Sequence, residues 1–197
     1  MESEGVLPGP APGVEAQLVA AARRGDQAAF AVLARDAAPM LERLALRVLG
    51  HRQDAEDAAQ EAILDAWRNL PRFRGEARFR TWAYRILVAR ALDVARRRRP
   101  VDPLPDVVTC AASGPAESAA SNDAERAIRD VIAELPPAQR TVLLLRTDHG
   151  LSYDEIAYVM GTGRDAVRMN LIEARKRLAR KLRGIVDLGG DAAGGAP

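Results

Sequence analysis

Acidic side chains crowd one short stretch of the chain. Residues 54–66 hold five acids and no base, namely Asp54, Glu56, Asp57, Glu61 and Asp65. Carboxylates can bind metal ions, but this set includes no His or Cys and lacks the spacing of a calcium loop, so we expect no metal site. On a helix, Asp57, Glu61 and Asp65 would line up as an acidic ridge because they are spaced four residues apart. Such a ridge is either a solvated helix face or a dock for a basic protein surface.

The stretch that follows is strongly basic and aromatic. Residues 72–99 contain ten arginines against two acids, and they include four of the chain's eight aromatic residues. Aromatic faces stack on unpaired bases while arginines follow the phosphates, so this composition suits single-stranded DNA. Helical spacing places Phe79 in the core and Trp82 at its border, and the arginine run 96–99 is either a solvated helix end or a phosphate contact. The residues expected to touch DNA are Phe73, Arg74, Arg78, Arg80, Trp82, Tyr84, Arg85, Arg96 and Arg97.

The remaining reactive residues give no support for catalysis. The two histidines, His51 and His149, fall in predicted turns, and the single cysteine, Cys110, falls in a predicted linker. No acid–base pair, metal-ligand cluster or phosphate-binding glycine loop accompanies them. We therefore expect no enzyme activity and no cofactor, and we interpret Cys110 as an inert free thiol.

Composition indicates a helical protein inside the cell. The 197 residues are 48% hydrophobic but only 4% aromatic, and they are rich in Ala, Leu, Val and Arg, which favours helix over sheet. A single cysteine fits a reducing cytoplasm. The chain shows no signal-peptide pattern and no apolar run near the roughly 20 residues that span a bilayer. We expect a cytoplasmic protein with no membrane insertion.

Cap and turn signals predict three helices before the loop at 71–77. Residues 1–13, rich in Pro and Gly, are predicted to be a disordered tail before the first helix. Asp26 should cap the second helix, which Pro39 should kink or briefly break. Asp54 should cap the third helix, with Asp57 completing a pair that resembles a capping box.

The fourth predicted helix, over about 78–98, has a less regular apolar stripe. Its members are Phe79, Ala83, Ile86, Leu87 and Val94. Arg90 falls within this stripe and must extend past it to solvent, while Val88 and Leu92 lie well away from it.

Residues 101–122 lose helical periodicity and fill with Pro, Ser, Ala and acids. A stretch of this length is too long for an ordinary loop within one compact domain. We therefore predict an all-α chain of two small helical domains, 14–100 and 123–183, joined by this flexible linker and followed by a flexible tail over 184–197.

The second domain has the pattern of a helix-turn-helix. Ser152 and Glu155 should form a capping box on a short helix, a glycine-containing turn follows at 161–163, and a basic helix begins at Arg164. In this motif the start of the second helix reads base edges and later residues hold phosphates. The alternative is a solvated face on a helical hairpin. The residues expected to contact duplex DNA are Arg164, Asp165, Arg168, Met169, Arg175 and Lys176.

With both halves assembled, the chain resembles an extracytoplasmic-function (ECF, group IV) sigma factor of bacterial RNA polymerase over about residues 14–183. In the first domain the likeness is carried by DAEDAAQEAILDAWRNL (54–70) and FRGEARFRTWAYRILVARALDVARRRR (73–99). In the second domain it is carried by LPPAQRTVLLLRTDHGLSYDEIAYVMG (135–161) and ARKRL (174–178). Long motifs in the right order on both domains are far more specific than a lone helix-turn-helix.

The resemblance implies a function and several partners. It implies that one helix docks on the clamp coiled coil of the polymerase largest subunit through Asp54, Glu56, Asp57, Gln60 and Glu61. It implies that the loop at 71–80 and the helix after it capture and melt the minus-ten promoter element, and that the helix from Arg164 reads the minus-thirty-five element. An anti-sigma factor is implied as a regulatory partner.

The recognition helix departs from the pattern of the family. The differing pairs are Thr162-Gly163, Met169-Asn170 and Ile172-Glu173. They leave fewer positive side chains near the groove, which argues against the usual promoter consensus.

Two other classes of function compete with the sigma-factor interpretation. A free-standing helix-turn-helix regulator would leave the acidic helix and the arginine-aromatic helix unexplained. A nucleic-acid enzyme would need a catalytic or metal-binding constellation that the sequence does not offer. If the protein does not associate with core polymerase, the sigma-factor interpretation fails in favour of the first alternative. The absence of metal-dependent activity on DNA would exclude the second alternative.

Overall fold

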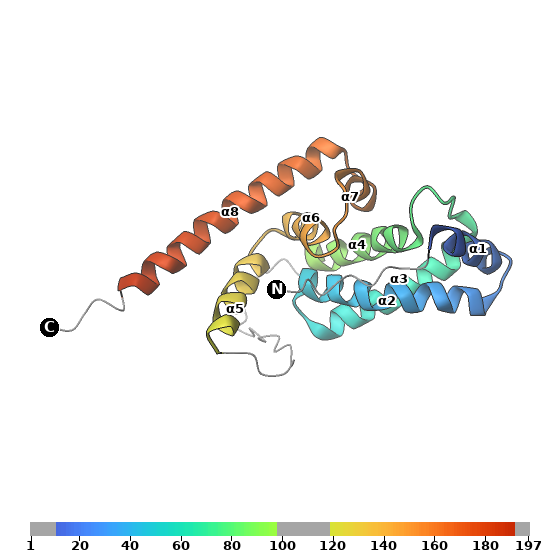
Figure 1. Ribbon diagram of the computed structural model, residues 1–197, viewed down its shortest axis with the longest axis horizontal. Helices are drawn as coiled ribbons and strands as arrows, with labels where there is room; N and C mark the ends of the chain where they lie inside the picture. The colour runs from blue at the N-terminus through green and yellow to red at the C-terminus, as the bar shows by residue number, and fades with distance from the viewer. Residues whose placement is uncertain (1–10, 98–118, 192–197) are drawn as a thin grey trace.

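The computed structural model describes residues 11–97 and 119–191, and within these ranges every regular element is a helix, which confirms the all-α prediction (Figure 1). The first domain comprises α1 (Pro12–Arg23), α2 (Gln27–Leu49), α3 (Arg52–Asn69), the short 3-10 helix η1 (Leu70–Arg72) and α4 (Phe79–Arg97). The second comprises α5 (Ala119–Ala133), α6 (Pro137–Thr147), α7 (Tyr153–Met160) and α8 (Arg164–Asp191). Most of the predicted linker, with Cys110, lies outside the described residues.

Local signals fix several helix ends as predicted. The Asp26 carboxylate accepts hydrogen bonds from the backbone N–H groups of Ala28 and Ala29, at 2.9 and 3.1 Å, and so caps α2. Ser152 and Glu155 form the predicted capping box of α7, each side chain accepting from the other residue's backbone N–H. These caps confirm the starts of both helices.

The predicted break in α2 and the predicted start of α3 are wrong. Helix α2 runs unbroken through Pro39, because residues on both sides of the proline, such as Ala37 and Leu41, are buried and hold the helix in place. Helix α3 begins at Arg52, two residues before the predicted cap, since the N–H of Ala55 already bonds to the carbonyl of residue 51 at 3.1 Å.

The acids predicted to cap α3 therefore do other things. Asp54 lies in the first turn, where its carboxylate is 3.7 Å from the His51 ring and suits the positive end of the helix dipole. Asp57 accepts a hydrogen bond from the Gln53 side chain at 3.2 Å and forms no capping box. The extended N-cap residue, His51, makes no side-chain cap.

The boundaries of the second domain also extend beyond the predicted ones. Helix α5 begins at residue 119, within the stretch predicted as linker. Helix α8 continues to residue 191, so most of the predicted flexible tail is helical; no proline interrupts the backbone ladder there, although three glycines lower its helix propensity.

The two domains pack directly against each other. Helices α6 and α7 pack against α4, α6 also meets α2, and α8 extends away from the first domain (Figure 1). Buried side chains of both domains join into one apolar core, with Leu44 and Leu87 on one side and Leu144 and Ile156 on the other. The second domain therefore covers a face of α4 that would be exposed on the first domain alone.

Candidate partner-binding and nucleic-acid interfaces

Helix α3 presents its predicted acidic ridge, but the two ends of the ridge differ. Asp57, Gln60 and Glu61 are exposed at the surface, as a docking site requires. At the other end Arg90 reaches across from α4 and pairs with both Glu61 and Asp65. Arg90 does not merely extend to solvent, as the pattern of α4 predicted; it joins the two helices.

Arg90 also changes the proton affinity of its partner. The Arg90 Nε atom donates to the Asp65 carboxylate at 2.9 Å, and this hydrogen bond is the main reason why the pKa of Asp65 lies below its usual range. Arg68 adds a second ion pair to Asp65 at 3.3 Å. Asp65 is thus neutralised within the domain, whereas Asp57 remains directed to solvent.

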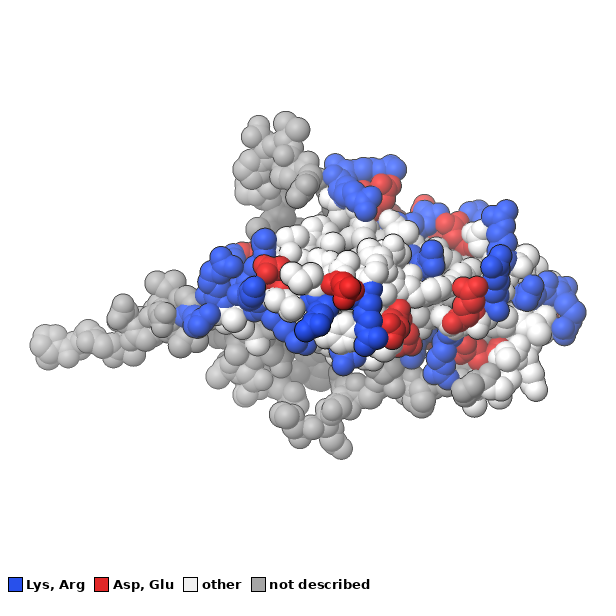
Figure 2. Space-filling model, turned by 90° about the horizontal axis from the view of Figure 1, so that it is seen from above, with Lys and Arg blue, Asp and Glu red and all other residues white. Residues whose placement is uncertain are grey.

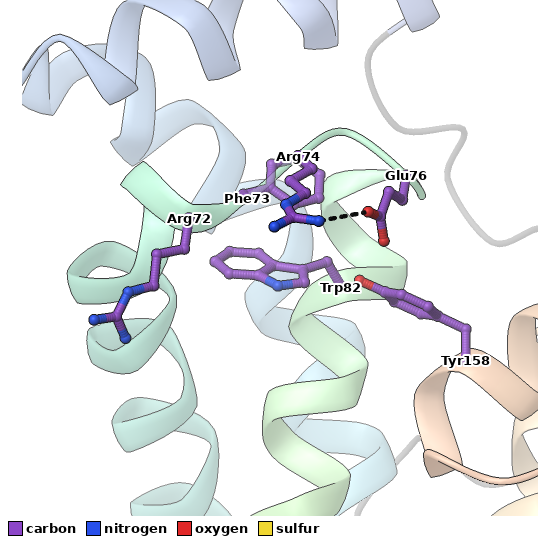
Figure 3. A pocket seen from close by; sticks show the side chains of 6 residues that line it. All are labelled: Arg72, Phe73, Arg74, Glu76, Trp82 and Tyr158. Carbon is purple, nitrogen blue, oxygen red and sulfur yellow. Dashed lines mark ion pairs between the residues drawn. The ribbon is translucent and has the colours of Figure 1, made fainter.

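A hollow of about 190 Å³ lies beside the loop between η1 and α4. Figure 3 shows its lining, which consists of Arg72, Phe73, Arg74, Glu76, Trp82 and Tyr158. The backbone of the loop turns at Gly75, whose φ of 75° is a left-handed conformation that glycine adopts at low cost.

Aromatic stacking forms the wall of this hollow. The Phe73 ring lies 4.8 Å from the Trp82 ring at a tilt of 30°, and Phe79 closes the cluster edge-on against Phe73 at 6.3 Å. Trp82 is only partly buried, while Phe73 is 4% exposed. Trp82 therefore presents a face that an unpaired base can stack on, and Phe73 supports it from behind.

Helix α1 holds the start of α4 in place. The Glu15 carboxylate accepts a hydrogen bond from the Phe79 backbone N–H at 2.8 Å and lies 3.9 Å from the Arg78 guanidinium. An acid at this position satisfies a free N–H of the first turn and complements the helix dipole. Sequence reasoning missed this contact, which spans 64 residues of chain.

Tyr84 and Phe73, both predicted to contact DNA, are buried in this structure. Tyr84 is 1% exposed, and its hydroxyl lies 2.7 Å from Nδ1 of His149 in the second domain. Burial raises the pKa of Tyr84 to about 12 and lowers the pKa of His149 to about 4, the latter with help from Arg43, Arg80 and Arg47. Both groups are therefore neutral near pH 7, and we assign the hydroxyl as donor to the unprotonated Nδ1.

The arginines predicted to contact the minus-ten element differ in exposure and in ion pairing. Arg78, Arg96 and Arg97 are exposed, and Arg97 pairs with Asp93 at 2.7 Å. Arg80 is partly buried. Arg74 forms an ion pair with Glu76 at 3.9 Å, drawn as the dashed line in Figure 3.

Arg85 is engaged by the second domain. Its guanidinium carbon stacks over the Tyr158 ring of α7, 4.8 Å from the centroid. The predicted DNA face of α4 is therefore partly occupied within the chain.

The helix-turn-helix has the predicted geometry. Gly161 ends α7 with a φ of 62°, and α8 packs against α6 and α7 through a buried stripe of Val167, Leu171 and Ala174. Ser152 caps the first helix of the motif, so both helices have well-defined ends.

The opposite side of α8 is exposed and basic. Met169 is 55% exposed, and within the described residues Arg168 and Arg175 form no ion pair. Lys176 lies 3.2 Å from Glu173, and Arg164 lies 3.7 Å from Asp154. In Figure 2, basic side chains gather along α8 with acids interspersed.

Several residues that join the domains were missed from the sequence. Arg47 of α2 pairs with Asp148, and Arg140 of α6 donates to the carbonyl oxygen of Val48 at 2.6 Å. His149, predicted as an ordinary turn residue, is 7% exposed. A signal for this contact was available in Val88 and Leu92, which lie off the apolar stripe of α4. Apolar residues at such positions indicate a second buried face, and Val88 is indeed buried.

No cluster of potential metal ligands occurs in the part of the chain that the structure describes. Among the same residues, no helix is both long enough and apolar enough to span a membrane.

Comparison with known proteins gives a consistent assignment for both domains. The family description "Sigma-70 region 2" matches residues 33–101, and "Sigma-70, region 4" matches residues 125–178. The RNA polymerase sigma-H factor of Pseudomonas aeruginosa is 36% identical over 180 residues, covering 84% of this chain and 92% of that protein. The ECF RNA polymerase sigma factor SigM of Mycobacterium tuberculosis is 34% identical, with coverage of 85% and 84%.

A solved structure agrees with these relatives. CnrH in complex with the cytosolic domain of CnrY superposes with a TM-score of 0.67 and 26% identity, over 87% of this chain and 98% of that one. The helical architecture, the two matched regions and the relatives above 30% identity together show that this chain belongs to the ECF sigma factors, non-catalytic subunits that direct RNA polymerase to specific promoters.

Proposed function

We propose that three surfaces of this sigma factor divide the work of initiation. The acidic ridge of α3 docks on a basic surface of the polymerase, chiefly through Asp57, Gln60 and Glu61. Trp82 and the arginines around it capture a melted strand of the minus-ten element. The exposed side of α8 reads the minus-thirty-five duplex.

The observation that carries this division is the separation of exposed charge along one chain. The exposed acids Asp57 and Glu61 lie on α3, and exposed bases occupy α8, where residues 164–183 hold eight bases and two acids. Opposite charges on separate helices favour two partners of opposite charge, a basic protein surface and a polyanion.

Within the minus-ten face, the partly exposed Trp82 is the residue best placed to stack on a base. It lies beside Arg72 and Arg74, whose guanidinium groups can meet phosphates, and it rests on a buried ring that fixes its orientation. We assign Phe73 to this supporting role instead of direct contact, and Tyr84 is covered by the second domain in this conformation.

Charge reversal on α3 tests the docking assignment. Asp57→Arg with Glu61→Arg should abolish binding to reconstituted core polymerase, because like charges then meet at the interface. A matched control, Glu42→Arg with Asp130→Arg, makes the same change of charge at exposed acids on α2 and α5. Equal binding by the two double variants, with helical content preserved, would refute the assignment.

Strand capture is tested separately from binding. Trp82→Ala should leave formation of the holoenzyme and duplex binding intact while reducing promoter opening, measured by permanganate reactivity of unpaired thymines. Normal opening by this variant would reject the role of Trp82.

We also propose a cognate anti-sigma factor and a cytoplasmic site of action. The support is the similarity to CnrH, whose structure was solved with the cytosolic domain of CnrY. Transcription from a target promoter in a reconstituted system should fall when the cognate partner is added, in proportion to the complex formed.

A further inference from the structure

The contact between the two domains is built from polar groups that fit each other closely. Arg47 of α2 meets Asp148, Tyr84 of α4 meets His149 at 2.7 Å, and Arg140 of α6 meets the carbonyl of residue 48 at 2.6 Å. These contacts join the ends of α2 and α6 and the middle of α4. They involve directional partners on both sides, which an incidental apolar contact does not require.

Asp148 accepts a hydrogen bond from the Thr147 hydroxyl at 2.7 Å, but its only cationic partner among the described residues lies in the first domain. Asp148 is the C-cap of α6, where a negative charge opposes the helix dipole and is unfavourable on its own. The Arg47 guanidinium supplies the opposite charge from the other domain. The pair is only partly removed from water, since the Arg47 and Asp148 side chains remain 31% and 21% exposed.

Arg140 binds carbonyl groups of both domains at once. Besides residue 48 at the end of α2, its guanidinium donates to the carbonyls of Ala133, the last residue of α5, and of Leu135 in the turn that follows. The carbonyls of residues 48 and 133 lie in the last turns of their helices, where carbonyl groups lack intrahelical partners and a cation is favourable. The guanidinium therefore links the end of α2 to the end of α5.

The docked second domain covers part of α4, the helix that carries Trp82 and the proposed site of strand capture. Tyr158 of α7 reaches to the rim of the hollow beside Trp82 (Figure 3) and engages Arg85 on the same helix as Trp82. The Tyr84 ring, on that helix as well, is buried under the second domain. An unpaired DNA strand that follows α4 would meet α7 in its path.

We propose that the second domain acts as an intramolecular inhibitor of the first, docking through Asp148 and His149 on α2 and α4 and holding the free sigma factor in a closed state that must open before a melted strand can bind. The inference of inhibition rests on the proposed strand-capture role of α4; the closed state itself does not.

A charge swap in the full-length protein tests the closed state. Asp148→Arg places a cation against Arg47 and should open the molecule, giving a larger radius of gyration by small-angle X-ray scattering. Combining it with Arg47→Asp restores opposite charges and should return the radius to the wild-type value. His149→Lys provides an independent opening variant, because it adds a cation near Arg43, Arg47 and Arg80.

A second readout tests inhibition with a fluorescent single-stranded DNA 12-mer of mixed sequence. If the free protein is about 90% closed, opening should strengthen its apparent affinity about tenfold, and the charge swap should reverse that gain. Helical content by circular dichroism verifies that each variant is folded.

The outcomes separate this inference from the proposed function. An unchanged radius in every folded opening variant would overturn the closed state, and an enlarged radius without a gain in DNA affinity would overturn inhibition. If opening does strengthen binding but adding Trp82→Ala leaves that binding unchanged, the closed state stands and the strand-capture assignment to Trp82 fails.

Discussion

The two surfaces predicted to meet DNA differ in how much of their charge is already engaged. On α4, Arg85 stacks on a tyrosine of the other domain, Arg90 is committed to two acids of α3, and Tyr84 is buried. On α8, Arg168 and Arg175 are exposed and form no ion pair within the described residues. The basic surface of α8 is therefore accessible as it stands, whereas the proposed closed state covers part of the basic surface of α4.

The largest effect should come from pH, acting on the covered surface of α4. Docking keeps His149 neutral, with a pKa near 4 against an ordinary value of 6.5, and the groups facing it are Arg43, Arg47, Arg80 and the Tyr84 hydroxyl. Because the folded-state pKa is lowered, docking is fully stable above pH 6.5 and weakens as pH falls toward 4. The loss is at most on the order of 3 kcal/mol.

Small-angle scattering across this range measures that effect. The radius of gyration should increase between pH 6.5 and 4, and His149→Asn should flatten the transition while His51→Gln preserves it. A transition that persists unchanged in the His149 variant would assign it to other groups, such as the acids.

The next largest effect should come from removing phosphate contacts on α8. Arg175→Ala with Lys176→Ala should weaken binding of the holoenzyme to promoter duplex by roughly tenfold or more and reduce the salt slope by about 2. The promoter fragment can be obtained by sequencing DNA bound to reconstituted holoenzyme. Arg52→Ala with Arg68→Ala on α3 is the matched control and should leave the salt slope unchanged.

A smaller effect is expected where α7 begins. Ser152→Ala removes the side chain that accepts from the Glu155 N–H at 3.2 Å, and it should lower the stability of the second domain by about 1 kcal/mol. Urea unfolding monitored by circular dichroism gives this value. Ser152→Asp retains a capping oxygen and should recover most of the loss; no recovery would mean that the cap is not the cause.

The smallest effect should follow from Arg90→Ala. Because Arg90 and its partners are partly exposed, the loss of stability should be only about 0.5–1 kcal/mol. Affinity for core polymerase should not fall. The substitution removes the cation that pairs with Glu61 and Asp65, so their negative charges become available to a basic partner. A clear drop in affinity, with the fold intact, would mean that Arg90 itself belongs to the docking surface.

The parts of the fold that depend on local chemistry were predictable from the sequence. Asp26 and Ser152 cap their helices as predicted, and the stripe containing Val167 and Leu171 is buried. These features need only neighbours within one or two helical turns. The helix through Pro39 was mispredicted because burial of its flanks, a tertiary effect, outweighs the lost backbone hydrogen bond.

The candidate site was predicted less well because its environment depends on distant residues. Tyr84 and His149 are 65 residues apart, and neither carries a local pattern that reveals the other. The same holds for Glu15, which lies 64 residues from the backbone group that it binds. Aromatic and basic composition indicated α4 as a candidate for binding DNA, but it did not distinguish the partly exposed Trp82 from the buried Tyr84.

Asp148 and His149 lie in the turn between α6 and α7, away from the residues proposed to select the promoter. Both residues precede the helix-turn-helix, and neither lies on the exposed side of α8. Substitutions in this turn can therefore alter how readily the sigma factor becomes active while its choice of promoter stays the same. Substitutions on α8 can redirect it to new promoters without changing that threshold, so dormancy and target choice are free to evolve independently.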